Sequence, residues 1–145
     1  MVLYELFVWH NSPPELSVLT ILVGLDLSDN LISSSIPSEM SALTKLSTMT
    51  LYSNSLSSAV PSVLSNLRSL QELSLYGNHL SNSFPDMFGG LTIIAVLDLH
   101  DNLFDGQRPS FSLSNQTSTL SYVDLSKNKL HGDPFFASVI RKFNL

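Results

Sequence analysis

The chain has 145 residues, no cysteine and a formal net charge of −5, and 43% of its residues are hydrophobic. This length and composition suit one folded domain with a core and exclude a disordered chain. The lack of cysteine excludes disulfides and thiolate metal sites. The acidic balance argues against nucleic acid and anionic membrane surfaces as partners.

Residues 1–21 are interpreted as a degenerate N-terminal capping unit. Residues 1–9 have apolar side chains at every second position, which predicts a strand that covers the open end of the following segment. Ser12-Pro13-Pro14-Glu15 is a capping box with proline at the first helical position, and it predicts a short helix.

The N-terminal segment has no clear signal peptide, because it carries Glu5 and no basic start. No apolar run reaches the ~20 residues of a spanning helix, so no membrane insertion is expected.

Three consecutive copies of a 24-residue pattern follow, at residues 22–45, 46–69 and 70–93. Counted from its first leucine, each copy has apolar residues at offsets 0, +3, +5, +10, +14, +18 and +21, asparagine at +8 and proline at +15. In the third copy these are Leu70, Leu73, Leu75, Leu80, Phe84, Phe88 and Leu91, with Asn78 and Pro85. An irregular repeat at 94–119 and the start of a fifth at 120–132 keep the frame. A fixed period in this range is the signature of a solenoid.

The asparagine at offset +8 recurs in every copy, as Asn30, Asn54, Asn78, Asn102 and Asn128. Its amide has two donor hydrogens and one acceptor oxygen. Buried inside the turn, it can satisfy backbone groups that the strand leaves unpaired. The sequence therefore predicts a structural asparagine ladder.

The frame breaks after Gly132. Asp133-Pro134 is an N-cap followed by proline, and residues 133–145 are predicted to form a short amphipathic capping helix. If the ends are poorly capped, we expect the chain to associate end to end with other repeats.

Asn115 lies in a glycosylation sequon and is a candidate acceptor if the protein is secreted.

The string LxxLxLxxNxL followed by xxxIPxxLxxLxx resembles the plant-specific leucine-rich repeat of receptor-like kinases, receptor-like proteins and polygalacturonase inhibitors. The resemblance covers residues 22–132. It implies an α/β solenoid, a right-handed superhelix with a parallel β-sheet on the concave face and short helices or loops on the convex face. It also implies an extracellular or cell-surface location. Because the family's flanking cysteine pairs are missing, it suggests a fragment of a receptor ectodomain, a truncated product or a free-standing array.

One departure from the family concerns offset +12, where the family has glycine. This chain has Ser34, Ser58 and Asn82 there, before Gly106 and Gly132. Serine is strained at the positive φ that glycine adopts freely. We therefore expect these turns to be reshaped or looser than in the family.

In-register stacking of the strands places the same offset of every repeat side by side. Offset +6 then gives a row on the concave face: Ser28, Tyr52, Tyr76, His100 and Ser126. The candidate ligand-binding residues are this aromatic stripe and its acidic border: Tyr52, Tyr76, His100, Asp26, Glu72, Asp98 and Tyr122. Protein interfaces enrich aromatic residues with a polar tip. The alternative is a solvated sheet in which tyrosine simply favours strands.

Two contacts between neighbouring repeats are also predicted. Lys127 is expected to form an exposed ion pair with Asp101. Asp98 and Asp124 are expected to be neighbours of like charge, which is either a mild cost or a sign of a cationic ligand.

The leading function is recognition of a protein or peptide ligand that carries basic and apolar groups. The alternatives are a structural or truncated array without its own ligand, and a polygalacturonase-inhibitor-like protein. Asp98, His100 and Asp101 suggest a metal or acid–base site at first sight, but no nucleophile motif, HExxH or phosphate loop accompanies them. We therefore predict no catalysis, no metal site and no cofactor.

Overall fold

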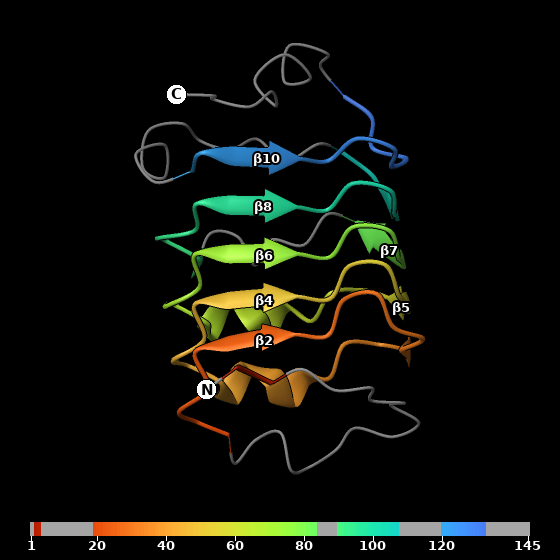
Figure 1. The fold of residues 1–145 in the computed structure, drawn as a ribbon. Coiled ribbons are helices and arrows are strands. Elements are labelled where there is room, and N and C mark those ends of the chain that lie inside the picture. The colour runs from red at the N-terminus through yellow and green to blue at the C-terminus, as the bar shows by residue number, and fades with distance from the viewer. Residues whose placement is uncertain (1, 4–18, 84–89, 108–119, 133–145) are drawn as a thin grey trace.

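The computed structural model describes residues 2–3, 19–83, 90–107 and 120–132. Its main sheet consists of parallel strands stacked side by side, as Figure 1 shows. These strands are β1 (Val2–Leu3), β2 (Gly24–Asp26), β4 (Thr48–Thr50), β6 (Glu72–Ser74), β8 (Val96–Asp98) and β10 (Tyr122–Asp124). The predicted solenoid with a parallel sheet is confirmed.

From β2 to β10, the register of the main sheet joins residues at the same offset of neighbouring repeats. Met49 pairs with Leu25 on one side and with Leu73 on the other, and Leu73 pairs in turn with Leu97. These strand-centre side chains point inward and are at most 1% exposed. Burying each contributes about 1.5–3 kcal/mol. The leucine pattern thus fixes both the core and the alignment of the outward-facing residues.

A second parallel sheet, which the sequence analysis did not predict, lies beside the main sheet. It contains β3 (Ser33–Ser34), β5 (Ser55–Ser58), β7 (His79–Ser83) and β9 (Leu103–Asp105). Its register differs, because Ser33 pairs with Ser55 and Ser57 pairs with His79, a separation of 22 residues. Short strands rich in serine carry little strand propensity, so the pattern did not reveal them.

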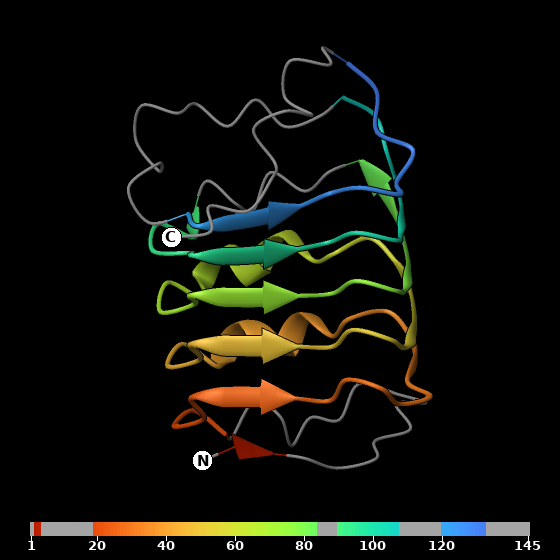
Figure 2. The same cartoon turned by 45° about the horizontal axis from the view of Figure 1, so that its top comes forward.

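In the described residues, the convex side carries two short 3-10 helices, which lie behind the main sheet in Figure 2. They are η2 (Ser38–Ala42) and η3 (Ser62–Asn66). Pro37 and Pro61 precede them with φ values of −66° and −61°, which proline fixes. Met40 and Leu64 anchor the two helices in the core with 0% exposure. The described part of the chain thus has short helices where the resemblance places them.

The turns at offset +12 are not reshaped, contrary to the expectation from their missing glycines. Ser34, Ser58 and Asn82 have φ values of 86°, 69° and 72°, close to the 83° of Gly106. The conformation is therefore kept and the serines carry its strain. Offset +7 is also left-handed in every repeat, at Asp29, Ser53, Gly77, Asp101 and Lys127.

Some predictions fall on residues that the structure does not describe. These are the capping box at 12–15, the sequon at Asn115 and the helix at 133–145. The N-terminal strand is confirmed for Val2 and Leu3, which pair with Gly24 and Leu25. Among the described helices, none has the length and apolar character needed to cross a membrane.

Candidate ligand-binding face

From the second repeat onward, the asparagine at offset +8 connects each repeat to the one before it, whereas Asn30 donates within its own repeat, to the carbonyl oxygens of Leu27 and Ser28. Asn78 Nδ2 donates to the carbonyl oxygens of Leu75 in its own repeat and Leu51 in the preceding one, both at 3.0 Å. Its Oδ1 atom accepts the backbone N–H of Leu56 at 2.9 Å. Asn54 and Asn102 repeat this arrangement. The ladder holds the turns that follow the main-sheet strands and so fixes the position of the adjacent outward-facing side chains.

At the ends of β4, β6 and β8 the outward-facing residues at offset +6 form an aromatic ladder, defined here as Tyr52, Tyr76 and His100. The ring centroids of Tyr52 and Tyr76 are 4.5 Å apart with planes inclined by 5°. Those of Tyr76 and His100 are 4.6 Å apart with planes inclined by 10°. Both faces of the Tyr76 ring are therefore covered, and burial is the main reason that the pKa of its hydroxyl is raised. The in-register sheet produces this stacking because it places the same offset of successive repeats about one strand spacing apart.

Aspartates at offset +4 organise the chain beside the ladder. The Oδ1 atoms of Asp26, Asp98 and Asp124 each accept the backbone N–H of the residue two positions later, at 2.8–3.2 Å. The hydroxyl of Ser28 also donates to Asp26. Burial acts to raise the pKa of Asp26, but the two hydrogen bonds from Ser28 and a weaker one from Thr50 together outweigh it, and the pKa is lowered.

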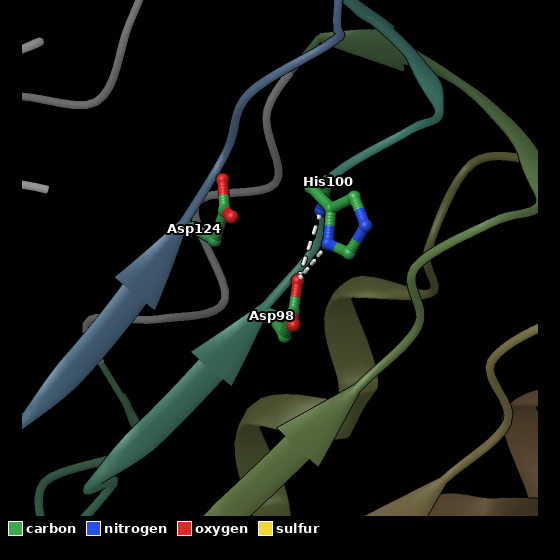
Figure 3. A group of neighbouring side chains, drawn as sticks. All are labelled: Asp98, His100 and Asp124. Atoms are coloured by element: carbon green, nitrogen blue, oxygen red, sulfur yellow. Dashed lines mark hydrogen bonds and ion pairs between the residues drawn. The ribbon is translucent and has the colours of Figure 1, made fainter. Parts of the chain in front are cut away.

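A compact polar cluster lies where β8 and β10 end, and Figure 3 shows its three principal side chains. Asp98 and Asp124 are paired directly across the two strands. His100 Nδ1 donates to Asp98 Oδ1 at 2.7 Å. The hydroxyl of Tyr122 lies 3.4 Å from Asp98 Oδ2 and 3.5 Å from Asp124 Oδ2. Burial, followed by the two carboxylates, raises the pKa of Tyr122 to about 12.

The sequence placed most of these residues on one face, but it grouped some of them incorrectly. Asp124 completes the cluster with Asp98 and His100, and Asp101 does not. Lys127 and Asp101 form no ion pair; in the described part of the chain the ion pair is that of His100 with Asp98. Both residues lie beyond the strand ends in left-handed conformation, where strand alternation no longer directs their side chains.

Comparison with protein-family models matches the family described as leucine-rich repeat over residues 22–43 and 44–104. A comparison with curated proteins found no match.

Among solved structures, the chain is similar to plant receptor ectodomains from Arabidopsis thaliana. The ectodomain of the membrane receptor kinase GASSHO1/SCHENGEN3, in complex with CASPARIAN STRIP INTEGRITY FACTOR 2, is 35% identical with a TM-score of 0.76 over 81% of this chain and 14% of that one. The HAESA ectodomain, in complex with an IDA peptide hormone, is 30% identical with a TM-score of 0.76 over 88% and 20%. The BIR3–SERK2 complex gives 29% identity and a TM-score of 0.73 over 99% and 69%. The chain thus spans a small part of the length of the first two.

Proposed function

Because the chain belongs to the leucine-rich repeat family, we propose that it is a recognition module that binds a protein or peptide segment on the exposed face of its main sheet. Two of the similar ectodomains are described in complex with a peptide hormone or a named factor. By analogy, the proposed setting is outside the cell or at its surface, and the proposed role is binding rather than catalysis.

Charge is the observation that carries the proposal. The outward-facing offsets +2, +4 and +6 of the main sheet carry the carboxylates of Asp26, Glu72, Asp98 and Asp124, and no lysine or arginine. A basic segment would find complementary charge on β2, β6, β8 and β10. Charge complementarity therefore selects a ligand segment with lysine or arginine as the occupant.

The aromatic ladder supplies the apolar part of the proposed interface. Stacking holds Tyr52, Tyr76 and His100 in place before any ligand arrives. Because both faces of Tyr76 are covered, a ligand meets the ring edges and the tyrosine hydroxyls rather than an open ring face. Rigid aromatic side chains of this kind contribute binding surface at a low entropic cost.

Selection from a random peptide library displayed on phage, with the immobilised chain as bait, tests the proposal. We expect the selected peptides to be enriched in lysine and arginine. As synthetic peptides, measured by fluorescence anisotropy, they should bind the Tyr52→Ala/Tyr76→Ala variant at least about tenfold more weakly than the wild type. Asp98→Asn should also weaken binding, and Asp105→Asn, an exposed carboxylate on β9, serves as its charge-matched control.

The outcome that contradicts the proposal is equally specific. Peptides that bind the double variant as tightly as the wild type, with both proteins folded by circular dichroism, would place recognition elsewhere. A library that yields no binder at all would favour an array without a ligand of its own.

A further inference from the structure

Although the sequence analysis predicts no metal site, we propose that Asp98, His100 and Asp124 form a binding site for one divalent transition-metal ion, with Zn²⁺ as the representative ion. One ligand atom from each residue can be chosen so that all three lie within 4.8 Å of one another. The set combines two carboxylate oxygens with one imidazole nitrogen, which suits zinc and its neighbours better than calcium or magnesium. This inference does not depend on the proposed peptide recognition.

The histidine distinguishes the cluster from a chance group of acidic residues. His100 Nδ1 already points at the Asp98 carboxylate, 2.7 Å away (Figure 3). Its ring is held against the face of Tyr76 with centroids 4.6 Å apart. A metal ion would displace the proton between Nδ1 and Oδ1, and the two atoms would move apart to about 3.4 Å to bind it tetrahedrally. The neutral imidazole would then carry its proton on Nε2. The nitrogen ligand is thus oriented before the metal binds.

The two carboxylates face each other without a full counter-charge. Asp98 and Asp124 are cross-strand partners, a position in which like charges are destabilising. The single proton of the Tyr122 hydroxyl can be donated to one of them at a time. In the described residues, the imidazole of His100 makes the one ion pair with either carboxylate, and only when it is protonated. A divalent cation would cancel both charges at once.

The site is partly exposed to solvent. The side chains of His100 and Asp98 are 25% and 13% exposed. Zinc bound to oxygen and nitrogen needs ligand distances of about 2.0–2.2 Å, so ligand atoms that lie up to 4.8 Å apart must be drawn together by rotation of their side chains. Three protein ligands leave at least one position for water or for an external donor group.

Isothermal titration calorimetry of the 145-residue chain with Zn²⁺, in the absence of any peptide, tests the site. We expect one saturable ion per chain and binding of Ca²⁺ and Mg²⁺ at least tenfold weaker. Asp98→Asn, Asp124→Asn and His100→Asn should each weaken Zn²⁺ binding by at least about tenfold. Zinc should also raise the melting temperature of the wild type and leave that of the three variants unchanged.

Two control variants separate a built site from general attraction. Asp101→Asn removes the same charge one residue from His100, and His79→Asn removes an exposed imidazole on β7. Both should bind Zn²⁺ as the wild type does. Equal weakening by Asp101→Asn, unchanged affinity in Asp124→Asn, or no saturable binding would overturn the site and leave an adventitious ion only. Because no peptide is present, failure here says nothing against peptide recognition.

Discussion

The Oδ1 atom of Asn78 accepts a hydrogen bond from the backbone N–H of Leu56, which lies 22 residues earlier in the chain. Asn78 is 4% exposed and Leu56 is fully buried, so water does not replace this bond easily. The stability of one repeat therefore depends on a side chain supplied by the next.

Replacing Asn78 by alanine should lower the free energy of unfolding by about 3 kcal/mol, because it leaves buried groups of Leu56, Leu51 and Leu75 without this partner. Urea denaturation followed by circular dichroism measures the change. Asn66→Ala, at an exposed position of η3, is the matched control and should change stability by less than about 0.5 kcal/mol. A similar small effect at Asn78 would show that the ladder is not a stabilising element.

Replacing Ser58 by glycine should stabilise the protein. Ser58 has a φ of 69°, a conformation that costs an L-residue about 1–2 kcal/mol. Glycine removes that strain, but it also lowers the free energy of unfolding by about 0.4–1 kcal/mol, because it increases the conformational entropy of the unfolded chain. The expected net gain is roughly 0.5–1 kcal/mol in the same denaturation experiment. Ser55→Gly, in the same strand but without positive φ, should instead destabilise.

Replacing Gly90 by alanine should destabilise the protein by about 1–3 kcal/mol through overpacking. A Cβ atom at Gly90 would lie 2.8 Å from the carbonyl oxygen of Ser65 and 2.9 Å from its Cβ. Adding Ser65→Gly to the variant should restore only part of the loss, because the carbonyl contact remains. Full recovery in the double variant would mean that the side chain of Ser65 alone causes the clash.

The hydroxyl of Tyr122 should titrate at about pH 12 in the folded protein. Subtracting the ultraviolet titration of Tyr122→Phe from that of the wild type isolates this group. Asp98→Asn combined with Asp124→Asn should bring its pKa down toward the usual value of about 10, since the two carboxylates disfavour the phenolate. A pKa unaffected by these changes would leave burial as the sole cause.

The sign of the stability effect follows from the same shift. The folded pKa of Tyr122 is raised, so the folded state holds its proton more tightly than the unfolded chain. The contribution is complete below the unfolded pKa of about 10 and is lost as the pH rises through the folded value. Wild type should lose more stability over this window than Tyr122→Phe does.

The sequence predicts the parts of this molecule that repeat by residue type. Leu73 and Asn78 recur at fixed offsets with a clear chemical reason, so the main sheet, its core and the row of Tyr52, Tyr76 and His100 follow from the pattern. The second sheet does not follow, because backbone hydrogen bonds between serine-rich segments leave little trace in side-chain type. The close approach of Gly90 to Ser65 likewise depends on how neighbouring repeats stack.

In the polar cluster too, the sequence predicts which residues are neighbours but not how their side chains are oriented. The register brings Asp98 beside Asp124, as the sequence predicts. The role of Tyr122 between the two carboxylates depends on side-chain conformation, which the repeat pattern does not specify. The predicted pairing of Lys127 with Asp101 fails because both positions have turned into left-handed conformation after their strands end.

The two sheets differ in how equivalent residues of neighbouring repeats are aligned. On the main sheet, equivalent residues form a row perpendicular to the strands, because strands β2 to β10 pair at equal offsets. On the second sheet the pairing slips by two residues at each repeat, so equivalent positions run along a diagonal. Duplication of a whole repeat, such as residues 46–69, would therefore extend the aromatic row in a straight line. In the second sheet, the same duplication would shift each new residue by two positions along the strand relative to its equivalent in the preceding repeat. Of the two sheets, the main sheet is therefore the one that can extend a binding surface for a long partner with its residues still in line.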